Sequence, residues 1–146
     1  MSSALDVNIL LYASDTSSEY HAKASSFLNT LITSGEACYV AWVTIMSYLR
    51  IATHARIFAA PLSPDEARAN IHRLLSRPNI RTIAETDGFW RVYQEVAGAI
   101  PVRGNLVPDA HLAALLKQHG IYRLYTRDRD FLKFGFLKVI DPIVAP

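Results

Sequence analysis

Apolar residues along the chain occur in two alternating patterns, short continuous runs and longer stretches at helical spacing. The short runs hold β-branched or aromatic residues and lie between polar, glycine or proline positions, which is typical of strands buried on both faces. Strands are therefore expected at Ala4–Leu5, Ala37–Ala41, Ile80–Glu85, Ile121–Thr126 and Leu137–Ile140.

The longer stretches place apolar residues three and four positions apart, as on one face of a helix. Three of them begin with N-cap signals: a capping-box pattern at Thr16–Glu19, Ser63 followed by Pro64, and Thr86 followed by Asp87. Helices are expected at Asn8–Ala13, Tyr20–Ile32, Trp42–Ile57 and Pro64–Leu75, then from the Thr86-Asp87 cap to Val96 and from Pro108 to Gly120.

Strands and helices alternate through the whole length of the chain. This alternation is typical of a mainly parallel sheet with helices on both faces. The sequence shows no internal repeat and no linker longer than a loop. We therefore expect one α/β domain over residues 1–146, a three-layer α/β/α sandwich.

Composition narrows the class of protein. Of the 146 residues, 51% are hydrophobic and 19% are charged, a balance that excludes disorder and a coiled coil. No apolar run approaches the roughly 20 residues that span a bilayer, and no secretory leader is recognisable, so a cytoplasmic protein without a membrane contact is expected. The single cysteine, Cys38, excludes a disulfide framework and a thiolate metal site.

Charge is unevenly distributed. Residues 1–49 carry four acids against one lysine, whereas residues 50–146 carry 14 bases against nine acids. Eleven of the 15 bases are arginines, whose guanidinium groups suit phosphate. This pattern favours a polyanionic partner, although arginines on an ordinary solvated surface would produce the same count.

Several acids stand where expected strands end. Asp6 follows the first strand, Asp128 and Asp130 follow Ile121–Thr126, and Asp109 lies in the first turn of the helix that begins at Pro108. Ligands of an open parallel sheet bind at the carboxyl ends of its strands, so these acids are expected to meet there.

Carboxylates gathered in one site repel each other unless a cation binds them, and an all-oxygen set favours Mg²⁺ or Mn²⁺. Such a site beside arginines suits phosphodiester hydrolysis. Taken singly, the acids have simpler explanations. Asp109 suits a helix N-terminus, and Asp128 and Asp130 suit a turn.

Three ordered segments, Leu5-Asp6-Val7-Asn8, Val107-Pro108-Asp109-Ala110 and Thr126-Arg127-Asp128-Arg129-Asp130, resemble the successive motifs of the PIN-domain ribonucleases. The resemblance spans essentially the whole chain and is strongest to the VapC toxins of type II toxin–antitoxin systems. It implies a PIN-like α/β/α fold and an endoribonuclease that depends on Mg²⁺ or Mn²⁺ and acts on tRNA, rRNA or mRNA. It also implies a homodimer and a VapB-like antitoxin whose tail fills the active site.

The resemblance assigns roles by position. Asp6, Asp109 and Asp128 match the metal-binding acids of the family, and Asp130 matches a further acid that ligates directly or through water. The polar residues that support the cluster are matched by Asn8 and Thr126.

One position departs from the family pattern. The family has a glutamate on the helix after the second strand, and here Ser47 takes that place. No acid lies between Glu36 and Asp65, so the number of bound ions stays open. Ser47 is assigned a supporting role, as a partner of a metal-bound water. The alternative function is a PIN-like module that binds RNA or an antitoxin without cleaving.

Arg50, Arg127 and Arg129 are the candidate RNA-binding residues, with Tyr125, Phe131 and Phe134 as a stacking face. The alternative is that the arginines pair with Asp128 and Asp130 and that the phenylalanines belong to the core. His111 lies two positions after Asp109, which places the two on different faces of a helix, so no catalytic role is assigned to it. A haloacid-dehalogenase-type phosphatase is excluded because position 8 is Asn, and a phospho-receiver domain is excluded because CYVAW holds no acceptor aspartate.

Overall fold

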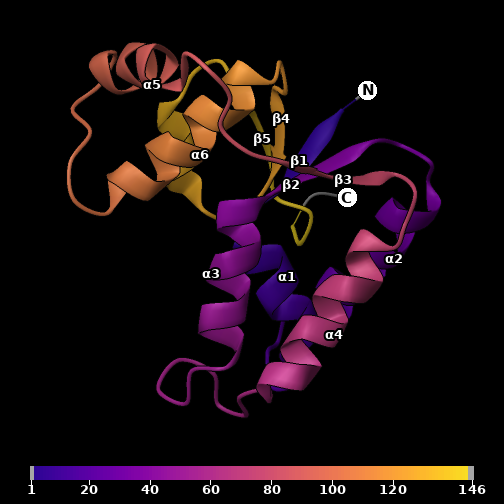
Figure 1. Ribbon diagram of the computed structural model, residues 1–146. Helices are drawn as coiled ribbons and strands as arrows, with labels where there is room; N and C mark the ends of the chain where they lie inside the picture. Colours follow the sequence, from indigo (N-terminus) through magenta and orange to yellow (C-terminus); the bar gives the residue numbers. More distant parts are fainter. Residues whose placement is uncertain (1, 145–146) are drawn as a thin grey trace.

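A five-stranded parallel sheet forms the centre of the computed structural model, which describes residues 2–144 (Figure 1). The strands are β1 Ser3–Leu5, β2 Cys38–Ala41, β3 Ile80–Ile83, β4 Arg123–Tyr125 and β5 Lys138–Ile140, in the order β3-β2-β1-β4-β5. Ala4 of the central strand is in register with Tyr39 on one side and Leu124 on the other. The carboxyl ends of β1 and β4 are therefore neighbours, although they are about 120 residues apart in sequence.

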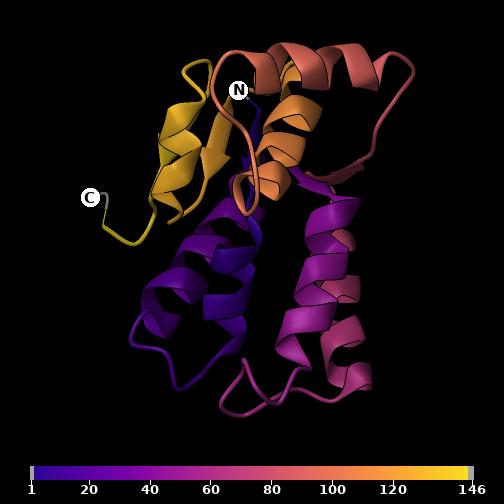
Figure 2. The ribbon, with the colours of Figure 1, turned by 90° about the vertical axis from the view of Figure 1, so that its left-hand side faces the viewer.

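Two groups of helices cover the sheet (Figures 1 and 2). The first comprises α1 Val7–Ser14, α2 His21–Thr33, α3 Trp42–Ala52 and α4 Pro64–Leu75, and the second comprises α5 Phe89–Gly98, α6 Leu106–Gln118 and the short 3₁₀ helix η1 Arg129–Lys133. Each group has its own buried apolar cluster. The expected α/β/α sandwich with a parallel sheet is thus confirmed.

Helix α6 is buried over most of its circumference. Its residues Leu112, Ala113, Leu115 and Leu116 are all 5% exposed or less and pack with strand β4 and with α5. Burial of one leucine side chain stabilises the fold by about 2 kcal/mol, so this helix is held firmly. The acid in its first turn, Asp109, is therefore attached to a rigid element.

Tyr48 links three helices of the other group. The side chain is 1% exposed, and its hydroxyl makes hydrogen bonds with Ser14 Oγ of α1 (2.7 Å) and Asn70 Nδ2 of α4 (3.0 Å). A buried hydroxyl without partners costs stability, and here both available partners are supplied. The network ties α1, α3 and α4 together beneath the sheet.

The N-terminus of α4 matches the expectation. Ser63 Oγ accepts a hydrogen bond from Glu66 N (3.1 Å), and Glu66 Oε1 accepts one from Ser63 N (3.2 Å). This is a complete capping box with Pro64 in the first turn.

The capping box expected at Thr16–Glu19 is wrong. Helix α2 begins only at His21, and its N-cap residue Tyr20 makes no side-chain capping bond. Asp15, which the pattern did not include, accepts hydrogen bonds from the backbone N and the Oγ of Ser17 instead. An Asx turn at Asp15 has taken the place of the cap.

Other boundaries shift by a few residues. Helix α3 ends at Ala52 rather than Ile57, because Thr53 leaves the helical conformation and the chain turns through His54, whose N donates to Ile51 O (3.1 Å). Helix α5 starts after Gly88, whose φ of 83° lies in the left-handed region, and not from a Thr86-Asp87 cap. Helix α6 begins at Leu106, so Pro108 sits inside its first turn, where no backbone donor is needed.

None of the helices within residues 2–144 is both long and apolar enough to cross a membrane.

The capping box at Ser63–Glu66 is present and the one expected at Thr16–Glu19 is not, and this difference can be tested by stability measurements. We expect Ser63→Ala to lower the free energy of unfolding by about 1 kcal/mol, because Glu66 N loses its partner. Thr16→Ala is the matched control and is expected to change it by less than about 0.5 kcal/mol. Urea unfolding followed by circular dichroism measures both, and an equal loss in the two variants would contradict the assignment.

Candidate active site

Asp6 lies at the carboxyl end of the central strand and begins helix α1. Its backbone N donates to Tyr125 O (3.0 Å), which extends the β1–β4 ladder by one bond. Its Oδ1 accepts from Val7 N (2.7 Å), so the carboxylate is the N-cap of α1. Only 8% of Asp6 is exposed. The sheet and the helix together fix where this charge sits.

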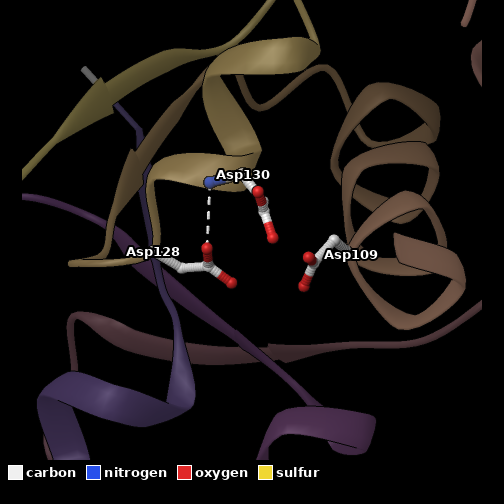
Figure 3. Close-up of side chains that lie close together, drawn as sticks. All are labelled: Asp109, Asp128 and Asp130. Carbon is white, nitrogen blue, oxygen red and sulfur yellow. Dashed lines mark hydrogen bonds between the residues drawn. The ribbon is translucent and has the colours of Figure 1, made fainter. Parts of the chain in front are cut away.

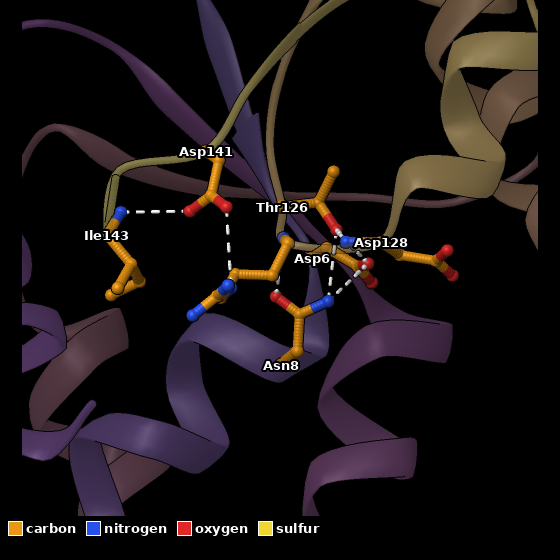
Figure 4. A network of polar contacts seen from close by, with 7 residues as sticks. Asp6, Asn8, Thr126, Asp128, Asp141 and Ile143 are labelled. Carbon is orange, nitrogen blue, oxygen red and sulfur yellow. Dashed lines mark hydrogen bonds and ion pairs between the residues drawn. The ribbon is translucent and has the colours of Figure 1, made fainter. Parts of the chain in front are cut away.

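Thr126 and Asn8 hold the other oxygen of Asp6 (Figure 4). Thr126 Oγ1 donates to Asp6 Oδ2 (2.7 Å), and Asn8 Nδ2 donates to the same oxygen (3.2 Å) and to Thr126 Oγ1 (3.0 Å). Thr126 is 1% exposed. The two residues that the family resemblance assigns to support therefore contact Asp6 directly.

The same threonine orients the loop that follows β4. Asp128 N donates to Thr126 Oγ1 (2.9 Å), and Asp128 Oδ1 accepts from Asp130 N (2.9 Å) as the N-cap of η1. The expectation that Asp128 forms a turn is therefore correct, but its second oxygen is left for another partner. One hydroxyl thus connects Asp6 with Asp128.

The carboxylates of Asp109, Asp128 and Asp130 point toward one another (Figure 3). One carboxylate oxygen from each of Asp109, Asp128 and Asp130 lies within 4.8 Å of the others. Asp109 comes from the first turn of α6, and the other two come from the loop after β4 and from η1. Asp109 and Asp128 are half-buried, and Asp130 is exposed.

Burial and mutual repulsion raise the pKa of two of these acids. The pKa of Asp109 rises to about 7, mainly because the group is partly buried and also because Asp128, Asp6 and Asp130 are negative. Burial likewise raises the pKa of Asp6, against the opposing effect of its hydrogen bonds from Thr126 and Val7 N. Lys133 Nζ, 3.4 Å from Asp130 Oδ1, offsets part of the charge.

Such a cluster can hold a divalent cation. The donors of Asp109, Asp128 and Asp130 are all carboxylate oxygens, the ligands that hard ions such as Mg²⁺ and Mn²⁺ prefer. A bound cation would also remove the repulsion that raises the pKa of Asp109. Asp6 lies behind them, close enough to affect the pKa of Asp109, with both oxygens already hydrogen-bonded.

The remaining predicted residues differ in burial. Ser47 is half-buried in the middle of α3, and Arg50 is exposed near the end of that helix. Arg129 is exposed at the start of η1. The predicted stacking face is wrong: Tyr125, Phe131 and Phe134 are 7%, 1% and 3% exposed, so they belong to the core.

Arg127 does not pair with the neighbouring acids. Its Nε lies 3.3 Å from Asp141 Oδ2, and its guanidinium stacks on the ring of Tyr20 at 4.1 Å. Neither Asp141 nor Tyr20 was selected from the sequence. Asp141 directly follows β5, so the rule that singled out Asp6 and Asp128 applies equally to it. No sequence signal identifies Tyr20.

His111 likewise has a local partner. Its Nε2 contacts Glu85 Oε1, and the ring meets Phe89 edge to face with centroids 5.6 Å apart. This hydrogen bond lowers the pKa of Glu85. The contacts agree with a structural role for His111.

The chain is similar to a known protein family over most of its length. The PIN domain family model matches residues 4–137. Ribonuclease VapC48 of Mycobacterium tuberculosis is 42% identical over 142 residues, covering 97% of this chain and 98% of the relative.

Solved structures share the fold at low sequence identity. VapBC2 from Rickettsia felis, bound to a DNA fragment of its promoter, has a TM-score of 0.70 at 15% identity and covers 96% of this chain and 98% of its own. VapC20 of Mycobacterium tuberculosis, described as a toxin that cleaves the sarcin-ricin loop, has a TM-score of 0.67 at 16% identity, with 92% and 96% covered. The protein therefore belongs to the PIN-domain family, among the VapC ribonucleases.

Proposed function

We propose that this protein is the toxin of a type II toxin–antitoxin module, an endoribonuclease that hydrolyses RNA phosphodiester bonds at the Asp109, Asp128 and Asp130 cluster. The observation that carries the proposal is the convergence of these carboxylates at the sheet edge in a chain 42% identical to a named VapC ribonuclease. The cytoplasm, where RNA substrates are present, is the proposed location.

The proposed cofactor is Mg²⁺ or Mn²⁺. The proposed ligands are Asp109 and Asp128, together with Asp6, which the family resemblance also assigns to the metal, and Asp130 is a further acid at the same place. When bound, a divalent ion at such a site lowers the pKa of the attacking water and offsets charge on the leaving oxygen. Thr126 and Asn8 fix the carboxylate of Asp6, and Thr126 also fixes the backbone of Asp128. The residues of the chain thus supply a preorganised negative site, which avoids reorganisation during the reaction.

RNA phosphates need cations beside this negative site. Arg50 and Arg129 are exposed and are the proposed phosphate contacts. Lys133 pairs with Asp130 and so adds a positive charge next to the acids.

The proposed protein partners are a VapB-like antitoxin and a second copy of this chain. The similarity to the toxin–antitoxin complex VapBC2 supports the antitoxin. The antitoxin tail is proposed to fill the acidic site, which would block it to RNA. The homodimer follows from the family resemblance alone.

A second function is favoured by one observation. Ser47 supplies no carboxylate at the position of the usual family glutamate, which would weaken the affinity for a metal ion. A module of this kind would bind RNA or an antitoxin without cutting.

Replacement of Asp109 tests whether the acidic cluster cleaves RNA. We expect Asp109→Asn to reduce RNA cleavage by about 100-fold or more, because the cluster loses a charged donor. Asp87→Asn, which removes an exposed acid outside the cluster, is the matched control and is expected to cleave like the wild type. Gel analysis of total RNA with Mg²⁺, Mn²⁺ or EDTA measures the cleavage.

The same assay separates the two functions. Cleavage by the wild type in Mg²⁺ or Mn²⁺ that EDTA abolishes supports the nuclease. RNA that stays intact under every condition, together with harmless overexpression of the wild-type gene, would instead support the binding module.

Thr126 offers a second test of the site. We expect Thr126→Val to lower cleavage about 10- to 100-fold, because Asp6 and Asp128 N both lose the hydroxyl that orients them. Thr126→Ser keeps the hydroxyl and is expected to retain most activity. A Thr126→Val variant that cleaves like the wild type, or a Thr126→Ser variant that loses as much activity as Thr126→Val, would contradict this role of the hydroxyl.

The raised pKa of Asp109 predicts a dependence on pH. The folded, metal-free protein holds a proton on Asp109 up to about pH 7, whereas the unfolded chain releases it near its ordinary value of 3.8. The stability contributed by this group therefore falls as the pH rises from about 4 to 7, by an amount on the order of 1 kcal/mol after allowance for solvent screening.

A cation competes with that proton, so metal binding stabilises more at high pH. We expect the rise in Tm caused by millimolar Mn²⁺ to be larger at about pH 8 than at about pH 6. Asp109→Asn should reduce this difference and raise the Tm of the metal-free protein at pH 8 by a few degrees. An Mn²⁺-induced shift that is the same at both pH values would contradict the prediction.

A further inference from the structure

We infer that Arg127 is a positioning residue, which fixes the acidic loop by pairing with Asp141 and stacking on Tyr20, and that it makes no contact with RNA. The inference rests on the metal site proposed above, because the loop it fixes carries Asp128 and Asp130. It replaces the RNA-binding role that the sequence predicted for Arg127.

The guanidinium of Arg127 is enclosed by partners from distant parts of the chain. Its Nε is 3.3 Å from Asp141 Oδ2, and both side chains are only about a quarter exposed, at 23% and 25%. Its Cζ lies 4.1 Å from the ring centroid of Tyr20. Within residues 2–144, Nη1 is buried and has no hydrogen-bond partner. The charged head therefore points into the protein.

The partners of Arg127 are themselves held in place. Asp141 Oδ1 accepts from Ile143 N (2.9 Å), which leaves Oδ2 for the arginine (Figure 4). Tyr20 meets Tyr12 of α1 edge to face, with ring centroids 5.1 Å apart. A planar guanidinium suits a carboxylate on its edge and an aromatic ring on its face at the same time.

The backbone of Arg127 belongs to the active-site network. Its N donates to Asn8 Oδ1 (3.2 Å), and Asn8 in turn donates to Asp6 and Thr126. Thr126 N donates to Ile140 O (3.0 Å), one residue before Asp141. Arg127 is thus held at its backbone by α1 and at its side chain by the segment after β5.

The position of Arg127 determines where the side chain of Asp128 points. Asp128 follows Arg127 directly, and its carboxylate must lie within a few ångströms of Asp109 although the two repel each other. A loop held only at Thr126 could swing away to relieve that repulsion. The contacts of Arg127 oppose the movement and keep the donors together.

Arg129, two residues further on, has the opposite environment. Its side chain is exposed and takes part in no ion pair within the described part of the chain. A phosphate can reach this guanidinium without breaking an existing pair. The two arginines of this loop therefore have different roles. Arg127 fixes the loop in place, and Arg129 is available to bind RNA.

Two binding measurements distinguish these roles. The first is Mn²⁺ affinity of the protein alone, measured by electron paramagnetic resonance. The second is the salt dependence of binding to a fluorescent single-stranded RNA in EDTA. We expect Arg127→Gln and Asp141→Asn each to weaken Mn²⁺ binding about tenfold and to leave the salt slope unchanged. Arg129→Gln is the matched control, expected to reduce the slope by about 0.7 and to change Mn²⁺ affinity less than about twofold.

Coupling and conservative variants complete the test. The double variant Arg127→Gln/Asp141→Asn is expected to bind Mn²⁺ no more weakly than either single variant, because both remove one contact. Tyr20→Phe keeps the ring face on which the guanidinium stacks and removes only the hydroxyl, so it is expected to weaken Mn²⁺ binding less than Asp141→Asn does. If Arg127→Gln does not fold by circular dichroism, Asp141→Asn carries the same prediction.

The outcomes are separable. A wild type that binds no Mn²⁺ overturns the proposed metal site and this inference with it. A wild type that binds Mn²⁺, with Arg127→Gln and Asp141→Asn unchanged in affinity, overturns the inference alone. A reduced salt slope in Arg127→Gln with unchanged Mn²⁺ affinity assigns the residue to RNA.

Discussion

The structure depends on keeping negative charges together that would otherwise separate. Asp6 is nearly buried at the end of the central strand, and Asp109, Asp128 and Asp130 crowd in front of it. Burying a carboxylate is costly unless hydrogen bonds satisfy it. Here one oxygen caps a helix and the other accepts from Thr126 and Asn8. That network makes the rest of the site possible.

The parallel sheet explains how these acids are brought together. Because β1 and β4 are adjacent, the residues that follow them meet at one edge, and Thr126 serves both. Helix α6 supplies Asp109 from a strongly buried segment on one side. Each acid therefore comes from an element whose place is set by apolar packing, and the repulsion is opposed by the whole fold.

Much of this arrangement could be predicted from the sequence. Alternation of strands and helices predicted the sandwich, and an acid after a strand together with one at the start of a helix predicted the edge at which Asp128 and Asp109 meet. The pattern at Thr16–Glu19 failed because Asp15, which lies outside it, accepts from Ser17 N and forms a turn before the helix begins. The environment of Arg127 could not be predicted, since its partners Tyr20 and Asp141 are distant in sequence and only the tertiary structure brings them together.

The contact between Arg127 and Asp141 has a consequence for how the protein can be joined to other molecules. Strand β1 starts at Ser3 on the sheet edge opposite the acids, whereas the segment from Asp141 to Ile143 braces the loop beside them. The two ends of the chain are thus unequal as attachment points. An affinity tag or fluorescent fusion placed before Ser3 would join the chain at the opposite end of β1 from Asp6, while one placed after Ile143 would join it directly beside the contacts that hold the acidic loop.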